Sequence, residues 1–568
     1  MNATTIITPA SEVAGDKKPI LEKEGVFARR HDLDALRAAA MLLGIVLHAA
    51  LSFAPIPWIV NDSVKSDLFY VVFSAIHGFR MPLFFMLSGF FTAMLWRKRG
   101  LKSLLLHRLR RILLPLVVCC FTILPTMWVV LTIVTQPSES GSSDEQAWSA
   151  AATGDIEQLR TQLEQPGFDV DAINPQTGST LLNSAVFLGQ HAVVELLVDN
   201  GADVNKPNAD QATALHLAAF MGRSDTAELL LAAGSDRNAT DGNGSTPADN
   251  LSVDFGTTAF IAGQFGIAVE EETLMAGRAE IAEQLNVGEG FANDDGSAAA
   301  LKGLYGLFFK LPVLMHLWFL AFLCWLVVAF MLYVPIANLL SFGKWPKWLV
   351  ASQASLLWLV PLTAFAQSTM SLGSVGPDTS DGLLPLPHVL AYYAIFFFFG
   401  ALYWDIDDRA GQLGRYWFVS LPVALFVVFP VLLGLVSSDP DLLAMVEDST
   451  ARLVLTNVLQ ALFVWMMTFG CIGLCRKLLP RENKTIRYLS DSSYWLYIAH
   501  LPLVFLGQWL VRDWQLPAVV KFALIVTVVI ALLLVSYRYL VRYTFIGRLL
   551  NGPRGRPNSD PVSPQPAV

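Results

Sequence analysis

Charged residues are scarce in this chain of 568 residues. Asp, Glu, Lys and Arg together make up 15% of the chain, and 54% of its residues are hydrophobic. A typical soluble domain carries about 25% charged residues. This composition excludes a disordered chain, a fibrous repeat and a nucleic-acid-binding protein as the main identity, and it leaves an integral membrane protein.

Cysteine is also rare, and we expect no secretory leader. The five cysteines all lie in apolar runs, so the sequence predicts neither a disulfide framework nor a metal site. Residues 1–30 are polar and have no apolar core of the kind that a signal peptide needs. We interpret them as a cytoplasmic N-terminal tail.

Apolar runs of about 20 residues, the length that crosses a bilayer as a helix, recur along the rest of the chain. The sequence therefore predicts an all-α, polytopic membrane bundle of about ten helices. The predicted spans are 36–58, 68–96, 112–134, 311–334, 348–365, 386–404, 416–436, 453–474, 494–511 and 518–537. Three spans thus fall in a first membrane part (31–135) and seven in a second (301–548), before a disordered cytoplasmic tail (549–568).

Basic residues predict the orientation of these spans, because short cytoplasmic loops carry an excess of Lys and Arg. With the N-terminus inside, the inner segments hold 26 basic residues, and the short outer segments hold 6. Both termini are then cytoplasmic, and the segment between the third and fourth spans is extracytoplasmic. We expect a multi-pass protein of the cell inner membrane, with the lipid bilayer as its surroundings.

The insert at residues 136–300 differs from the rest in charge and in pattern. It carries a formal charge of −21, whereas the remainder carries +13. Thr180, Thr213 and Thr246 are spaced by 33 residues, and the second of them begins the motif Thr-Ala-Leu-His216-Leu-Ala. This period and motif resemble ankyrin repeats, an α-solenoid that usually binds other proteins. We expect His216 to stabilise a turn and the stack to recruit a protein partner.

Ionisable residues inside predicted spans are costly and therefore point to function. The first span holds Asp34, Arg37 and His48. Arg37 and His48 lie three turns apart and share a helix face. An ion pair between Asp34 and Arg37 at the inner end of the helix is an equally good explanation of those two. His48 lies mid-span, where the alternative is a core histidine with satisfied hydrogen bonds.

Further polar residues occur in later spans and at their ends. The second span contains His77-Gly-Phe-Arg80-Met and then Ser88-Gly89, and the small pair predicts close helix packing. Arg108 and Arg111 belong to a basic cluster at the inner end of the third span, which suits either topology or an anionic ligand. His316, Trp318 and His500 follow, and the tryptophan fits an interface anchor better than a sugar-stacking platform.

Five motifs in this order resemble the membrane acyltransferase-3 family, and most closely its branch of glucans biosynthesis protein C type. They are Arg37-x10-His48, His77-x-x-Arg80-Met with Leu-Phe-Phe-Met-Leu-Ser88-Gly, Arg108-x-x-Arg111, His316-Leu-Trp-Phe-Leu and Tyr488-Leu-Ser-Asp-Ser-Ser-Tyr-Trp. The resemblance covers about residues 28–134 and 304–548, and the ankyrin insert departs from it.

The resemblance implies transfer of an acyl group from cytoplasmic acyl-CoA, as donor substrate, to an extracytoplasmic carbohydrate, with no bound cofactor. Ester transfer needs a base for the acceptor hydroxyl and positive charge for the oxyanion. His48 or His77 fits the first role, as a base or as an acylated residue, and Arg37 or Arg80 fits the second. The expected substrate-binding residues are Asp34, Arg108, Arg111, His316, Trp318 and His500.

Two other functions fit parts of this pattern. Intramembrane His and Arg also mark proton relays, so a transporter or channel with an ankyrin domain that gates it or recruits partners is one alternative. The two halves show no evident internal repeat of the kind that transporters often carry. The other alternative is a membrane scaffold with a degenerate enzyme body, against which the retained ionisable residues argue.

Overall fold

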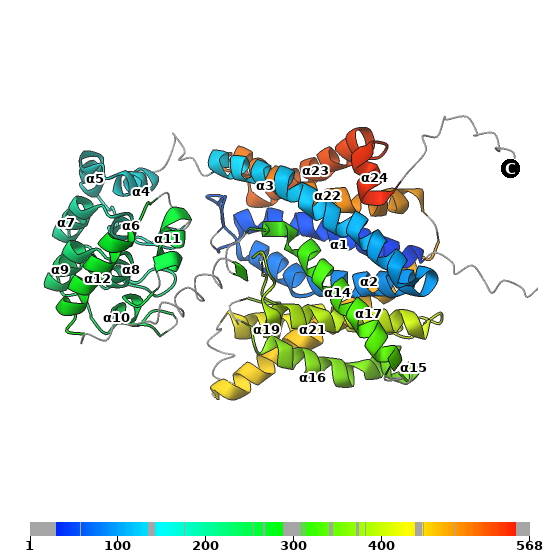
Figure 1. Cartoon of the computed structure of the whole chain (residues 1–568). Helices are drawn as coiled ribbons and strands as arrows, with labels where there is room; N and C mark the ends of the chain where they lie inside the picture. The colour runs from blue at the N-terminus through cyan, green and yellow to red at the C-terminus, as the bar shows by residue number, and fades with distance from the viewer. Residues whose placement is uncertain are drawn as a thin grey trace, which may run out of the picture.

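The computed structural model of the chain describes residues 30–552, except for 57, 135–142, 175–176, 243, 254, 265–266, 288–307, 310–312, 340–344, 371–373, 381, 438–445, 447 and 482. Residues 1–29 of the predicted N-terminal tail (1–30) and residues 553–568 of the predicted C-terminal tail (549–568) lie outside these residues. Residues 549–551 were predicted to be disordered, but they form the end of a helix. The described residues contain helices and no strand, which confirms the all-α prediction. Figure 1 shows a bundle of long helices and, beside the end where α3 finishes, a smaller stack of short ones.

Four long helices form the centre of the bundle. α1 (His31–Ala50) packs against α2 (Asp67–Arg108) and α22 (Lys484–Val511), and α2 packs along α17 (Pro387–Ile406). Glycines let the last pair touch. A Cβ on Gly89 would lie 1.8 Å from the carbonyl oxygen of Phe397. Gly89 is therefore a packing residue, as its sequence predicts.

Eight helices in the described part of the chain are long and apolar enough to cross a membrane. One of them, Asp67–Val134, contains two predicted spans, because α2 is interrupted at Gly100 (φ 77°, ψ 171°) before the chain continues into α3 (Leu114–Val134). Only glycine adopts such a conformation without strain. The structure confirms a polytopic membrane bundle, and the count of ten spans stays a prediction.

The predicted fifth span, 348–365, is not one helix. The chain forms a single turn, α15 (Lys347–Val350), and then α16 (Leu356–Gln367), which has 12 residues and is about 18 Å long. Ser352 causes the break: its hydroxyl donates to the carbonyl of Trp348 and accepts from the amide of Ala354 at 3.1 Å. Serine side chains compete in this way with the backbone bonds of a helix.

The remaining membrane helices follow the predicted apolar runs more closely. They are α14 (Trp318–Leu339), α18 (Trp417–Val423) with α19 (Phe429–Val436), α21 (Ser449–Leu478) and α23 (Ala518–Ser536), and a short α24 (Phe545–Asn551) ends the described chain. α22 starts ten residues before its predicted span. The Asn483 side chain accepts from the amides of Thr485 and Ile486, so the cap sets this start.

The insert forms a stack of helix pairs with its own apolar core, which confirms the ankyrin repeats. In the second full unit, the Thr213 amide donates to Nδ1 of His216 at 3.2 Å, and Nε2 of that ring donates to the Ser245 carbonyl at 3.0 Å. His216 thus stabilises the turn at the start of its unit, as predicted, and it also bonds to the next unit. The helices are α4 (Ser143–Thr153), α5 (Ile156–Leu163), α6 (Leu181–Leu188), α7 (His191–Asp199), α8 (Ala214–Met221), α9 (Ser224–Ala232), α10 (Pro247–Asn250), α11 (Phe255–Gln264) and α12 (Glu271–Gln284).

A buried ion pair fastens the α1–α2 connection to the start of α23. Lys521 Nζ lies 2.8 Å from Asp62 Oδ2, and their side chains are 0% and 1% exposed. Lys521 also donates to the carbonyl of Arg512. Burial lowers the pKa of the neighbouring Lys65 to about 8, although Asp62 opposes the shift. Lys65 therefore loses its charge nearer to neutral pH than an exposed lysine does.

Removing only the lysine of this pair is expected to destabilise the protein strongly. Lys521→Met removes the directly bonded cation and leaves the buried Asp62 carboxylate with only the more distant Lys65, and breaking a buried ion pair in this way typically costs about 3–5 kcal/mol. The double variant Asp62→Asn, Lys521→Met is expected to lose clearly less stability than Lys521→Met alone. Thermal unfolding in detergent measures both. Equal losses in the single and double variants would mean that the pair is not coupled.

Candidate active site

Three histidines from separate parts of the chain meet inside the bundle. His48 lies near the end of α1, His316 in the turn before α14, and His500 in α22. The ring centroids of His48 and His500 are 5.2 Å apart, and those of His316 and His500 are 5.6 Å apart. The structure thus brings together three of the residues that the sequence singled out.

Hydrogen bonds to the backbone orient two of these rings. His316 Nε2 donates to the Ile498 carbonyl at 3.0 Å, and His500 Nδ1 donates to the Tyr497 carbonyl at 2.7 Å. These bonds fix the tautomers, so Nδ1 of His316 and Nε2 of His500 carry lone pairs. Both atoms are buried without a protein partner, and so is Nδ1 of His48. The cluster therefore offers ring nitrogens that can exchange a proton with a substrate.

The turn that carries His316 is strained. Met315 has φ 44°, in the left-handed region that a side chain other than glycine rarely adopts. The hydroxyl of Tyr497 donates to the carbonyl of His316 at 2.6 Å and holds this turn against α22. Backbone strain of this kind costs about 1–3 kcal/mol and clusters at functional sites.

Arg80 supplies the positive charge of the cluster. It comes from α2, and its guanidinium lies against α1 where Gly44 leaves room: a Cβ there would be 2.1 Å from Nη1. Its Nε is buried without a protein partner. His48 lies within electrostatic reach of both Arg80 and His77. A buried guanidinium beside an imidazole is suited to stabilise an oxyanion.

His77 lies one turn before Arg80 on α2. Its Nδ1 donates to the carbonyl of Val375 at 2.9 Å, and its ring stacks on Phe73 with centroids 5.2 Å apart. The bond to Val375 occupies one ring nitrogen. Of the two histidines proposed as a base, His48 therefore has the more direct place in the cluster.

A glutamine that sequence reasoning missed holds the His48 end of α1. Gln508 of α22 is 1% exposed; its Nε2 donates to the His48 carbonyl at 2.8 Å, and its Oε1 accepts from the Trp58 indole at 3.2 Å. The Trp58 ring stacks over the His48 ring, with centroids 6.2 Å apart. Only the packing of α22 on α1 reveals this role, since nothing in the local sequence marks Gln508.

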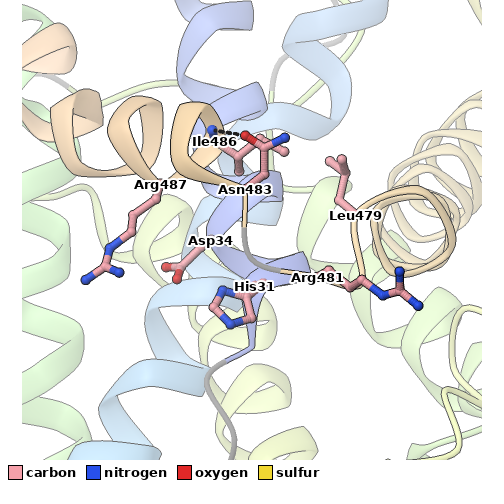
Figure 2. Close-up of a pocket in the computed structure, with 7 residues that line it drawn as sticks. All are labelled: His31, Asp34, Leu479, Arg481, Asn483, Ile486 and Arg487. Atoms are coloured by element: carbon pink, nitrogen blue, oxygen red, sulfur yellow. Dashed lines mark hydrogen bonds between the residues drawn. The ribbon is translucent and has the colours of Figure 1, made fainter.

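Arg37 and Asp34 lie at the other end of α1. Arg37 Nη2 is 3.4 Å from Asp34 Oδ1 and donates to the Ser490 hydroxyl at 2.6 Å. Eleven residues separate Arg37 from His48, which is about 16 Å along the helix. Arg37 therefore does not act on the same atom as His48, and Arg80 is the arginine that lies near it. Asp34 also borders a small polar pocket with His31, Arg481 and Arg487 (Figure 2).

The basic cluster surrounds a hollow of about 530 Å³ at the α2–α3 junction. Its lining residues are Arg99, Lys102, Ser103, Leu106, His107, Arg110 and Arg111. Arg108 does not line it, since its guanidinium donates to the Thr92 hydroxyl at 2.6 Å. Arg111 also donates to the carbonyls of Arg548 and Leu549, at 2.7 and 3.0 Å. The hollow can take an anionic group of phosphate size or larger.

Trp318 lies in the aromatic core of the bundle. It is 8% exposed, and Phe85, Phe322 and Tyr393 surround its ring with centroids 5.1 to 6.2 Å away. Its contact with a substrate stays a prediction. In the described part of the chain, no group of three or more His, Cys, Asp or Glu residues is arranged to hold a metal ion.

Comparison with known proteins assigns the family. Residues 30–151 and 264–537 match the acyltransferase domain family, which is more than half of the chain. The chain belongs to this family. Residues 147–241 match three copies of the ankyrin repeat. The two segments that match the acyltransferase family contain all ten site residues that the sequence predicted.

Curated relatives match a shorter stretch. Over 113 residues, 20% of this chain, it is 35% identical to glucans biosynthesis protein C of Escherichia coli K12. Over 112 residues it is 32% identical to the protein of the same name in Salmonella paratyphi B. The chain spans 29% of the length of these relatives.

Proposed function

We propose that this protein is an inner-membrane O-acyltransferase that moves an acetyl or succinyl group from cytoplasmic acyl-CoA to a hydroxyl of an extracytoplasmic carbohydrate. The observation that carries the proposal is the buried cluster of His48, His500 and Arg80 inside a membrane bundle of this family. The name of the relatives supports a glucan or a similar polysaccharide as the acceptor.

The reaction follows from the positions of these groups. A ring nitrogen of His48 takes the proton of the acceptor hydroxyl, and the oxygen attacks the thioester carbonyl. Arg80 stabilises the negative charge on the tetrahedral intermediate. The C–S bond then breaks, the ester remains on the sugar, and the CoA thiolate takes the proton back from His48. Gln508 and Trp58 keep the His48 end of α1 in place.

Comparison of glycan extracts tests the reaction in cells. Wild-type and deletion strains are extracted, and the glycans are compared by mass spectrometry. An added acetyl or succinyl mass that disappears on deletion and returns on complementation supports the proposal. Identical glycan masses in both strains would reject it.

The donor is proposed to bind with its phosphates in the basic hollow. Replacing Arg110 and Arg111 by Gln is expected to raise the apparent KM for acyl-CoA about tenfold or more, because bonds from charged groups are worth about 1.5–3 kcal/mol each. Lys at both positions keeps the charge but loses the bidentate grip, so it is expected to be intermediate. Steady-state kinetics in detergent measures the change.

Arg415→Gln is the control, since this inner-side arginine does not line the hollow. An unchanged KM for acyl-CoA in the Arg110, Arg111 double variant would reject the hollow as the donor site. The basic cluster would then serve only to orient the protein in the membrane. Arg108→Gln removes the hydrogen bond to Thr92 and is therefore expected to alter the packing of α2 rather than the contacts to the donor.

The ankyrin stack is proposed to lie on the extracytoplasmic side and to capture a protein partner there. Glu228 is exposed on α9, so Glu228→Cys is expected to react with a membrane-impermeant maleimide in intact cells that have a permeable outer layer. Lys477→Cys, at the proposed inner end of α21, is the control and is expected to react only after lysis. The opposite pattern would invert the orientation.

A further inference from the structure

A short segment between α16 and α17 dips into the bundle and meets three helices. The amide of Gly376 donates to Oε1 of Gln460 on α21 at 2.9 Å, and its carbonyl accepts from Nε2 of Gln367 on α16 at 3.3 Å. The neighbouring Val375 carbonyl accepts from His77 on α2. Gly376 has φ 114°, and a Cβ on it would be 2.7 Å from His77 Nδ1, so only glycine fits. This segment links two carboxamides to the active-site region.

The same neighbourhood contains polar atoms that bond to no protein group. They are Nε2 of Gln460, Oε1 of Gln367 and both Nδ2 and Oδ1 of Asn457. Asn457 and Gln460 are 3% and 4% exposed and lie one turn apart on α21. On α2, the hydroxyl of Ser74, one turn before His77, is buried and unpartnered too. Buried polar side chains nearly always have partners, so these need an explanation.

We propose that Asn457, Gln460, Gln367 and Ser74, here called the carboxamide cluster, bind hydroxyl groups of the acceptor carbohydrate. The set offers amide donors, carbonyl acceptors and a hydroxyl. Sugar hydroxyl groups both donate and accept, so they match such a mixed set. Three of the four residues carry neutral carboxamides and the fourth carries a neutral hydroxyl, which favours a neutral polyol over an anion. The proposal rests on the acyltransferase function proposed above.

The substitution Asn457→Leu separates binding from a structural role. It removes two buried atoms without partners, so the unfolding temperature of the substrate-free protein is expected to stay or rise. The KM for a linear gluco-oligosaccharide is expected to rise about tenfold through the loss of two hydrogen bonds. The KM for acyl-CoA is expected to stay unchanged. Ser74→Ala, a smaller change, is expected to raise the acceptor KM a few-fold.

Thr468→Val is the matched control. Thr468 lies on the same helix and is 0% exposed, but its hydroxyl already donates to the Val464 carbonyl at 2.7 Å. This variant is expected to keep the acceptor KM of the wild type. An unchanged acceptor KM in both Asn457→Leu and Ser74→Ala, with normal transfer by the wild type, would overturn the carboxamide cluster alone. Absence of transfer by the wild type would overturn the proposed function, and this inference with it.

Discussion

His48→Ala is expected to lower acyl transfer by about 10²- to 10⁴-fold, the usual cost of losing a general base. The ring lies 5.2 Å from His500, and its Nδ1 is buried without a protein partner. A histidine in this position has no structural hydrogen bond to lose at that nitrogen. Expression and membrane insertion are therefore expected to remain normal. Transfer of a radiolabelled acyl group by the purified protein measures the rate.

His388→Ala is the matched histidine control, because His388 lies in the first turn of α17 and is not one of the three clustered histidines. It is expected to retain near-wild-type transfer. Near-wild-type transfer by His48→Ala would reject His48 as the base. A loss of equal size in the two variants would point to a general defect in folding.

Arg80→Gln is expected to lower kcat by about 10²- to 10³-fold, the usual cost of removing one group that stabilises an oxyanion. The KM for acyl-CoA is expected to change little, because the guanidinium acts on charge that develops in the transition state. Gly44→Ala tests the same residue without touching it. Its Cβ would overlap Nη1 of Arg80, so it is expected to displace the guanidinium and lower kcat as well.

Gly507→Ala controls for the glycine substitution. A Cβ on Gly507 of α22 would meet its nearest neighbour, Ile525, at 3.4 Å, an ordinary contact. This variant is expected to keep its activity. An Arg80→Gln variant with unchanged kcat would exclude Arg80 from the chemistry, and an active Gly44→Ala variant would show that the guanidinium can sit elsewhere.

The sequence predicted the helices and the repeats because both depend on local periodicity. Apolar runs of membrane length form α1, α17 and α23, and the first residue of each helix lies within five residues of its predicted start. The 33-residue period became the ankyrin stack, down to the turn role of His216. The segment of the fifth predicted span is not one continuous helix, because the hydroxyl of Ser352 bonds to the backbone and interrupts it; the apolar composition of the segment gave no sign of this break.

The site was predictable in part. Sequence spacing shows which residues lie on the same face of a helix, but it does not show which other helices pack on that face. Arg37 and His48 both lie on α1, but their separation along this helix keeps them apart. Gln508 and Gly44 owe their roles to contacts of α1 with α22 and with Arg80. The strain at Met315 and the polar atoms around Gly376 also exist only once the helices are assembled.

Transfer across a sealed membrane tests the central proposal most directly. The purified protein is reconstituted in vesicles with a linear gluco-oligosaccharide inside and radiolabelled acetyl-CoA or succinyl-CoA outside. Labelled sugar ester is expected to accumulate inside wild-type vesicles and not inside vesicles with His48→Ala. Labelled ester at equal rates in both, or in wild-type vesicles only after they are made leaky, would contradict it.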